Sequence, residues 1–277
     1  MKAAICAVFL AVLPLTALAQ IEFGTLILLD SSPDEIVVAA DSRAYSASTQ
    51  FDNRCKITTL GNQVIFAASG KTALPSADAR IEWDSHTIAR DIFRRLRAKK
   101  TNQPMPMRLA KAWGRQVQKK LELDIQRDRK ETLSGVKDDL LTSALFAGFD
   151  QNAPYIVTGF ITYGRAPNGS MYTHFSIGAV SRKAAAVQLG KADIATELFA
   201  QKTERAIQWR KSLRIENADD RIAIPVISAL QFSIENYPPI DLGGRMVPAL
   251  GGPIDAVRLT RTQGIQWIQR KPNCPEN

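Results

Sequence analysis

A glycine–threonine pair and an Asp-Ser-Arg triplet bracket the first two strand-like runs of the chain. The stretch 23–44 reads FGTLILLDSSPDEIVVAADSRA, in which a polar turn joins two apolar runs. A plain β-hairpin requires neither the pair at 24–25 nor the triplet at 41–43. A threonine hydroxyl is a weak nucleophile that needs a base nearby, and a free α-amino group with a pKa of about 7.7–8.0 can be that base. A threonine in this stretch could therefore act as a nucleophile only if such a base lies close to it.

Two further features follow along the chain, NRCKIT around Lys56 and FAASG ending at Gly70. Each feature also has an ordinary structural explanation. Thr25 suits a strand because it is β-branched, and Lys56 suits a solvated strand position. Asp41 suits a turn with a surface ion pair, and Gly70 suits a backbone turn with positive φ. Single residues therefore leave both interpretations open.

The order of these features resembles the proteasome β-subunit family of N-terminal nucleophile hydrolases. In that family an apolar strand leads into Asp-Ser-Arg-Ala, and the nucleophilic threonine lies 16 residues before the aspartate, as Thr25 lies before Asp41 here. The family processes itself at a Gly-Thr bond, which corresponds to Gly24-Thr25. The resemblance further implies that Lys56 lies on the family's lysine-bearing strand and that the amide of Gly70 faces the active site.

The resemblance implies a role for each of these residues. Thr25 would be both nucleophile and, through its freed amine, base. The Lys56 ammonium would lower the pKa of that amine by like-charge repulsion, and Asp41 would hold Lys56 in place and keep it charged. The N–H of Gly70 would stabilise the oxyanion that forms when a carbonyl is attacked.

The chain departs from the family pattern at later support positions. The family usually has a serine after the glycine that corresponds to Gly178, and an Asp and a Ser ahead of the pair at 251–252. Those places are occupied here by Ala179, Val247 and Leu250. Residues that could substitute for the missing groups are Ser181, Asp241 and Arg245.

Hydrophobic periodicity predicts the elements that must position these residues. Alternating apolar runs and turn residues predict strands at 26–29, 36–40, 48–60 and 64–67. Helical spacing predicts a helix that opens at Pro75-Ser76 and a second helix around Trp113. The remaining predictions are strands at 143–150, 154–164 and 171–180, helices at 184–213 and 221–237, and two strands at 254–270.

Blocks of strands and blocks of helices are segregated in this order, which favours an α+β domain. The resemblance implies more specifically a four-layer αββα sandwich of two antiparallel sheets spanning residues 25–277. We see no internal repeat and no low-complexity linker that would divide the chain.

The N-terminus reads as an export signal. Residues 1–19 combine Lys2, an apolar core and the small-x-small sequence Ala17-Leu18-Ala19. We therefore expect a secreted or periplasmic protein without a membrane anchor, and residues 20–24 as a short propeptide. Cys55 and Cys274 would remain after signal removal, and they could pair or stay as two thiols.

The formal net charge of +9 lies partly in basic runs at 94–100 and 127–130. No aromatic residues are interleaved with these runs, so we predict no nucleic-acid binding. His86 and His174 are the only histidines and lack neighbours at metal-ligand spacing, so we expect neither a metal nor a cofactor.

The sequence thus favours an exported, threonine-type peptidase or amidase that matures at Gly24-Thr25 and acts on a peptide or a small amide. The alternative is a non-catalytic protein of the same fold that serves as a binding or assembly scaffold. Homo-oligomerisation is left open.

Overall fold

The computed structural model places most of the chain beyond residue 24. It describes residues 25–46, 49–52, 54–75, 81–99, 101–133, 136, 139–183, 185–217, 220–241, 244–272 and 274. The expected signal peptide, the expected propeptide and Gly24 lie outside the described residues.

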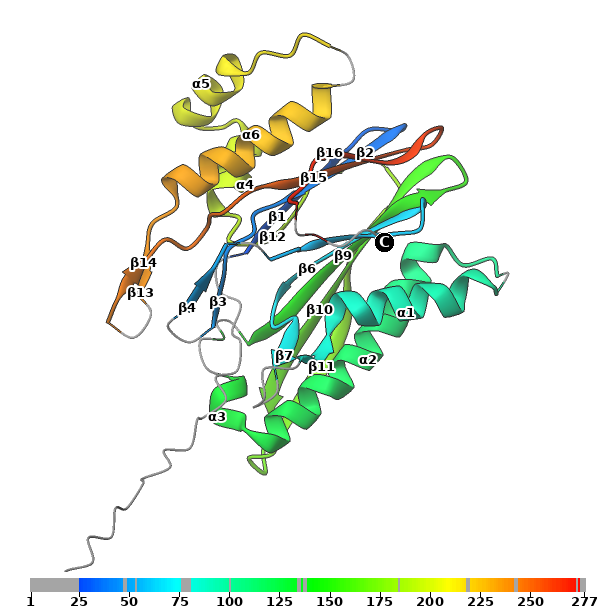
Figure 1. The fold of residues 1–277 in the computed structure, drawn as a ribbon, viewed down its shortest axis with the longest axis vertical. Coiled ribbons are helices and arrows are strands. Elements are labelled where there is room, and N and C mark those ends of the chain that lie inside the picture. The colour runs from blue at the N-terminus through cyan, green and yellow to red at the C-terminus, as the bar shows by residue number, and fades with distance from the viewer. Residues whose placement is uncertain are drawn as a thin grey trace, which may run out of the picture.

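Two five-stranded antiparallel sheets form the centre of the molecule (Figure 1). The first sheet has the order β12-β1-β2-β15-β16, with bounds Val187–Gly190, Leu26–Ser31, Glu35–Ala40, Asp255–Thr260 and Gly264–Gln269. The second has the order β11-β10-β9-β6-β5, with bounds Met171–Ser181, Ala153–Arg165, Leu140–Asp150, Val64–Gly70 and Ile57–Leu60. Short two-stranded pairs are β3 (Ala44–Ser46) with β4 (Thr49–Phe51), β7 (Ala73–Pro75) with β8 (Ile81–Asp84), and β13 (Ile240–Asp241) with β14 (Met246–Val247).

Helices lie on the outer side of each sheet. In Figure 1, α1 (Ser85–Arg97) and α2 (Met105–Arg127) run beside the second sheet, and α3 (Arg129–Thr132) follows α2. The first sheet is covered by α4 (Asp193–Ala200) and α6 (Asp220–Asn236), with α5 (Glu204–Ser212) beside them.

Three hydrophobic clusters match this arrangement. One lies between the sheets and joins side chains such as Val38 of β2 and Ile65 of β6. A second packs α1 and α2 on the second sheet, with Trp113 against Phe146. The third packs α4 and α6 on the first sheet, with Leu28 as one of its members. Both faces of the inner strands are therefore buried, which explains their uninterrupted apolar runs, while the edge strands β11 and β16 are partly exposed.

The prediction of an α+β architecture is confirmed, and three element boundaries are corrected. The helix expected from Pro75-Ser76 begins at Ser85, because the Asp84 side chain caps it by accepting a hydrogen bond from the Thr87 amide. The strand expected at 48–60 is two strands, β4 and β5. The helical segment expected at 184–213 begins with β12, which extends the first sheet beyond β1.

Within the described part of the chain, no helix is both long enough and apolar enough to cross a bilayer.

Candidate active site

A buried ion pair between Asp41 and Lys56 forms the centre of the candidate site. Asp41 follows the last residue of β2 and is 0% exposed, while Lys56 precedes β5 and is 1% exposed. Lys56 Nζ lies 3.0 Å from Asp41 Oδ1 and also donates to the carbonyl oxygen of Arg43. The pair therefore connects the end of a strand in one sheet to the start of a strand in the other.

The same carboxylate holds the beginning of β1. The Leu26 amide donates to Asp41 Oδ1 at 3.0 Å, and the Asp41 amide donates to the Leu26 carbonyl at 3.2 Å. Leu26 N and Lys56 Nζ thus share one oxygen at 3.0 Å each, so they lie no more than about 6 Å apart. The structure accordingly brings Thr25, Asp41 and Lys56 together at one end of the two sheets.

The hydroxyl of Thr25 is buried without a partner. Thr25 is 2% exposed, and its Oγ1 makes no hydrogen bond with any of the described residues. Buried side-chain oxygens are usually hydrogen-bonded, because leaving one unsatisfied costs about 1–3 kcal/mol. The Thr25 hydroxyl is thus free of structural hydrogen bonds to the described residues, and its neighbour Leu26 binds the carboxylate that pairs with Lys56.

Burial and charge act in opposite directions on the Asp41 carboxyl. Removal from water raises its pKa above the ordinary value. The Lys56 ammonium and the amide N–H groups of Leu26 and Gly251 oppose that rise, because they stabilise the ionised form. The ion pair itself rests on geometry, because the two side chains are buried and lie 3.0 Å apart.

Gly70 ends β6 with a φ of 87°, as expected for a glycine at a turn. A Cβ atom at this position would lie 2.5 Å from the Leu141 carbonyl oxygen, so no other residue fits without a shift. This geometry agrees with the structural explanation of Gly70 and leaves its role as an oxyanion donor a prediction.

Gly190, at the end of β12, is the neighbour of Thr25 that sequence reasoning missed. Its φ is 85°, and a Cβ atom there would lie 1.8 Å from the Thr25 carbonyl oxygen and 3.2 Å from Ser69 Oγ. The Lys191 amide donates to the same Thr25 carbonyl at 2.8 Å. The only sequence signal was a glycine at the end of the short apolar run VQLG, which lay inside the segment expected to be helical.

Gly178 is the glycine that the family pattern follows with a supporting serine. It lies on β11, at the edge of the second sheet. A Cβ atom on Gly178 would contact the side chains of Phe160 and Thr158. Ser181 ends the same strand and its hydroxyl donates to the Lys183 carbonyl at 3.0 Å. Ala179 and Ser181 are thus on a strand that pairs with β10 and not with β1.

The segment before β15 supports Asp41 through its backbone. The Gly251 amide donates to Asp41 Oδ2 at 3.2 Å, and the Gly251 carbonyl accepts from the amides of Ser42 and Arg43. Val247 and Leu250, at the departures from the family pattern, are buried apolar side chains. The substitutes considered from the sequence, Asp241 and Arg245, are exposed.

A second charged pair, Arg43 with Asp52, binds the segment before β15 through the Leu250 carbonyl. The Arg43 guanidinium binds both carboxylate oxygens of Asp52, at 2.7 and 2.9 Å, and donates to the Leu250 carbonyl at 2.9 Å. Hydrogen bonds from Arg43 lower the pKa of Asp52 below its ordinary value. The Asp-Ser-Arg triplet is therefore part of a bonded network and not an isolated turn.

Cys55 and Cys274 form a disulfide bond across 219 residues of sequence, which decides between the two alternatives for these cysteines.

Among the described residues, no cluster of three or more His, Cys, Asp or Glu side chains could hold a metal ion. His86 is buried, with its Nδ1 2.9 Å from Thr58 Oγ1, and His174 is exposed.

Comparison with known proteins adds no assignment. None of the known protein-family profiles matches this chain, and no curated protein matches it significantly.

Proposed function

We propose that the protein is an exported threonine-type N-terminal nucleophile hydrolase that matures at Gly24-Thr25 and cleaves amide bonds. The observation that carries the proposal is the buried Thr25 Oγ1, which has no hydrogen-bond partner among the described residues, in a residue whose neighbour Leu26 binds the carboxylate of the Asp41–Lys56 pair. The related fold proposal is a four-layer αββα sandwich, and the three hydrophobic clusters support it.

Maturation would use the same hydroxyl as catalysis. Thr25 Oγ1 attacks the Gly24 carbonyl carbon, the Gly24–Thr25 C–N bond breaks, and the Thr25 nitrogen takes up the proton to become an amine. Water then hydrolyses the ester that joins Gly24 to Oγ1. The products are a free carboxylate on Gly24 and a chain that begins with Thr25.

The freed amine is the base of the catalytic cycle. It accepts the Oγ1 proton as the hydroxyl attacks a substrate amide, and it returns a proton to the leaving amine. The neighbouring Lys56 ammonium favours the neutral amine, because two close positive charges repel. Water then hydrolyses the acyl-enzyme, which restores the hydroxyl.

The disulfide supports the proposed export to the periplasm or the exterior, because such bonds persist in oxidising compartments. We propose a peptide or a small acylated molecule as substrate.

The experiment is to determine the N-terminus and intact mass of the mature wild-type chain and of the Thr25→Ala variant. A wild-type chain that starts at Thr25, together with a variant that keeps residues 20–24, supports the hydrolase. Thr25→Ser should still mature, since serine retains the hydroxyl, but more slowly than the wild type. The matched control is Thr196→Ala on the exposed face of α4, which should mature like the wild type.

The second candidate is a non-catalytic scaffold of the same fold. Buried apolar Val247 and Leu250 favour it, because they occupy positions where the resemblance implies polar support. A wild-type chain that starts at Gln20 and never at Thr25 would favour the scaffold over the hydrolase.

A further inference from the structure

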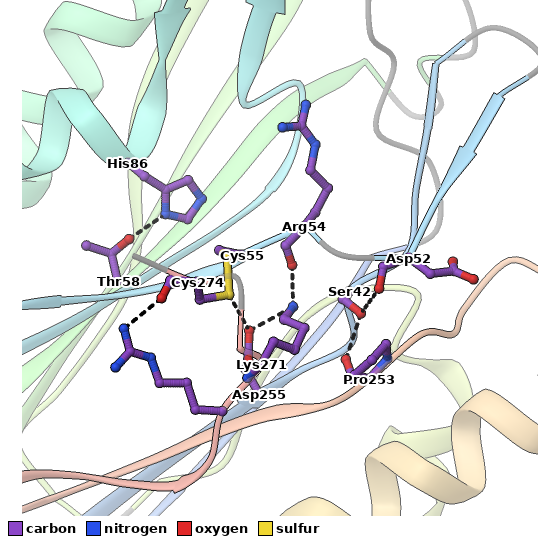
Figure 2. Close-up of a disulfide and its surroundings, with 11 residues drawn as sticks. Ser42, Asp52, Arg54, Cys55, Thr58, His86, Pro253, Asp255, Lys271 and Cys274 are labelled. Carbon is purple, nitrogen blue, oxygen red and sulfur yellow. Dashed lines mark hydrogen bonds and ion pairs between the residues drawn. A yellow bond between two sulfur atoms is a disulfide. The ribbon is translucent and has the colours of Figure 1, made fainter. Parts of the chain in front are cut away.

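A second buried ion pair lies next to the first, and the proposed chemistry does not use it. Lys271 is 4% exposed and Asp255 is 0% exposed. Lys271 Nζ lies 2.8 Å from Asp255 Oδ2, and the Lys271 amide donates to Asp255 Oδ1 at 2.9 Å (Figure 2). One carboxylate thus binds both the backbone and the side chain of the same lysine, which fixes the lysine firmly.

This pair holds the segment that immediately precedes Lys56. Lys271 Nζ donates to the carbonyl oxygen of Arg54, two residues before Lys56 (Figure 2). Cys55, the next residue, is bonded to Cys274, whose Sγ lies 3.6 Å from Asp255 Oδ2. Lys271 and Cys274 therefore contact two consecutive residues ahead of the proposed catalytic lysine.

The segment 54–56 needs this support because it belongs to neither a helix nor a strand. The Arg54 amide donates to the Ser42 carbonyl at 3.2 Å, which joins the segment to the residue after Asp41. The Lys56 side chain has several rotatable bonds, so the position of Lys56 Nζ depends on where the backbone of residues 54–56 is held.

The two ion pairs are also neighbours across the first sheet. Asp255 of β15 pairs with Ala40 of β2, and Asp41 is the next residue. Burial lowers the pKa of Lys271, and the Asp255 carboxylate opposes that shift. The charges of the first pair act on the pKa of Lys271 in opposite directions, since Lys56 lowers it and Asp41 raises it.

We propose that Lys271, fixed by Asp255 and by the Cys55–Cys274 disulfide, is a positioning residue that holds Lys56 against Asp41 and close to the Thr25 amine. This inference rests on the proposed function, in which Lys56 must lie close to the Thr25 amine to lower its pKa. Lys271 touches no reacting atom in this scheme. Its effect reaches the reaction through the location of the Lys56 ammonium and hence through the pKa of the Thr25 amine.

The experiment measures that amine directly and needs no substrate. The mature chain is trace-labelled with acetic anhydride between pH 6 and 10, digested with trypsin and analysed by mass spectrometry. The tryptic peptide 25–43 contains no lysine, so acetylation of this peptide at its amine reports only on Thr25. Its extent against pH gives the apparent pKa of the Thr25 amine.

The variants are Lys271→Met and Cys274→Ser, with Lys111→Met on the exposed face of α2 as the matched control. In the wild type and the control, the apparent pKa should lie below the ordinary range of about 7.7–8.0. In both variants it should rise toward that range by roughly 0.5–1 unit, because the Lys56 ammonium is held less closely. A merely structural role would lower stability or yield and leave this pKa unchanged.

The outcomes separate the two proposals. A wild-type chain without a Thr25 N-terminus overturns the proposed function and the positioning role with it. A wild-type chain that matures, with variants whose amine has the wild-type pKa, overturns the positioning role alone. If Lys271→Met does not fold, Asp255→Asn decides the matter, because it removes the carboxylate that fixes the Lys271 ammonium and keeps both the lysine and the disulfide.

Discussion

Gly190 contacts Thr25 so closely that a Cβ atom on the glycine would lie 1.8 Å from the threonine carbonyl oxygen. The next residue, Lys191, donates its amide to that same carbonyl at 2.8 Å. The backbone of the proposed nucleophile is therefore fixed by β12, a strand that arrives about 160 residues later in the chain.

Gly190→Ala should displace Thr25 and abolish maturation, because the new methyl group cannot share the space of the carbonyl oxygen. Gly169→Ala is the matched control: Gly169 has a φ of 81°, close to the 85° of Gly190, but a Cβ atom there would meet nothing within 4 Å. The control should lose only the roughly 1–2 kcal/mol that a left-handed conformation costs. Intact mass and thermal unfolding measure the two effects, and equal maturation of both variants would contradict the prediction.

Lys56→Met should destabilise the protein by about 3–5 kcal/mol, because it leaves the Asp41 carboxylate buried without its cation. The double variant with Asp41→Asn should be more stable than Lys56→Met alone, since no uncompensated charge remains, and it should still fail to mature. Denaturant unfolding of both variants tests this coupling. The comparison pair is Arg94 and Asp91 on the exposed face of α1, where removal of the cation should change stability by about 0–1 kcal/mol. Additive effects of the Asp41 and Lys56 substitutions would argue against a coupled pair.

Acid should weaken the network around the Asp-Ser-Arg triplet through Asp52. Its folded pKa is lowered by Arg43 from an ordinary value of 3.8, so the unfolded chain takes up the proton first as pH falls. The stabilising contribution is therefore present above pH 3.8 and is lost as pH falls through the lower, folded pKa. Asp52→Asn should be less stable at neutral pH and should lose less stability on acidification. Asp91→Asn should follow the wild-type acid profile, and an unchanged profile in Asp52→Asn would refute the assignment.

Replacing both cysteines of the Cys55–Cys274 bond by serine should lower the free energy of unfolding by about 2–5 kcal/mol, because the bond closes a long loop in the unfolded chain. Dithiol reductant should destabilise the wild type similarly and leave the double variant unaffected. Chemical unfolding with and without reductant measures both effects, and a reductant effect in the double variant would point to another cause.

The sequence predicted the α+β architecture because strand and helix periodicities are segregated in it. It also indicated Thr25, Asp41 and Lys56, since they follow or precede apolar runs in a spacing that resembles a known family. The structure gathers these three residues at one end of the sheets. Their catalytic roles stay predictions until the N-terminus of the mature protein is known.

The sequence did not predict β12 or the second ion pair. The run VQLG has only four residues, and the apolar residues after it follow helical spacing, which concealed the strand. Lys271 and Asp255 are 16 residues apart on either side of the last hairpin. Their contact depends on how β15 pairs with β16, and local pattern carries no information about which side chains meet across a hairpin end.

The disulfide joins an early part of the chain to a much later one. Cys274 is synthesised 219 residues after Cys55, and Cys55 directly precedes the proposed catalytic Lys56. A nascent chain contains Thr25, Asp41 and Lys56 well before it contains Lys271 and Cys274. Until then, the segment ahead of Lys56 lacks the Lys271 hydrogen bond and the disulfide. Under the proposed function, the disulfide would therefore link self-cleavage to a chain that already extends to Cys274 and has met oxidising conditions.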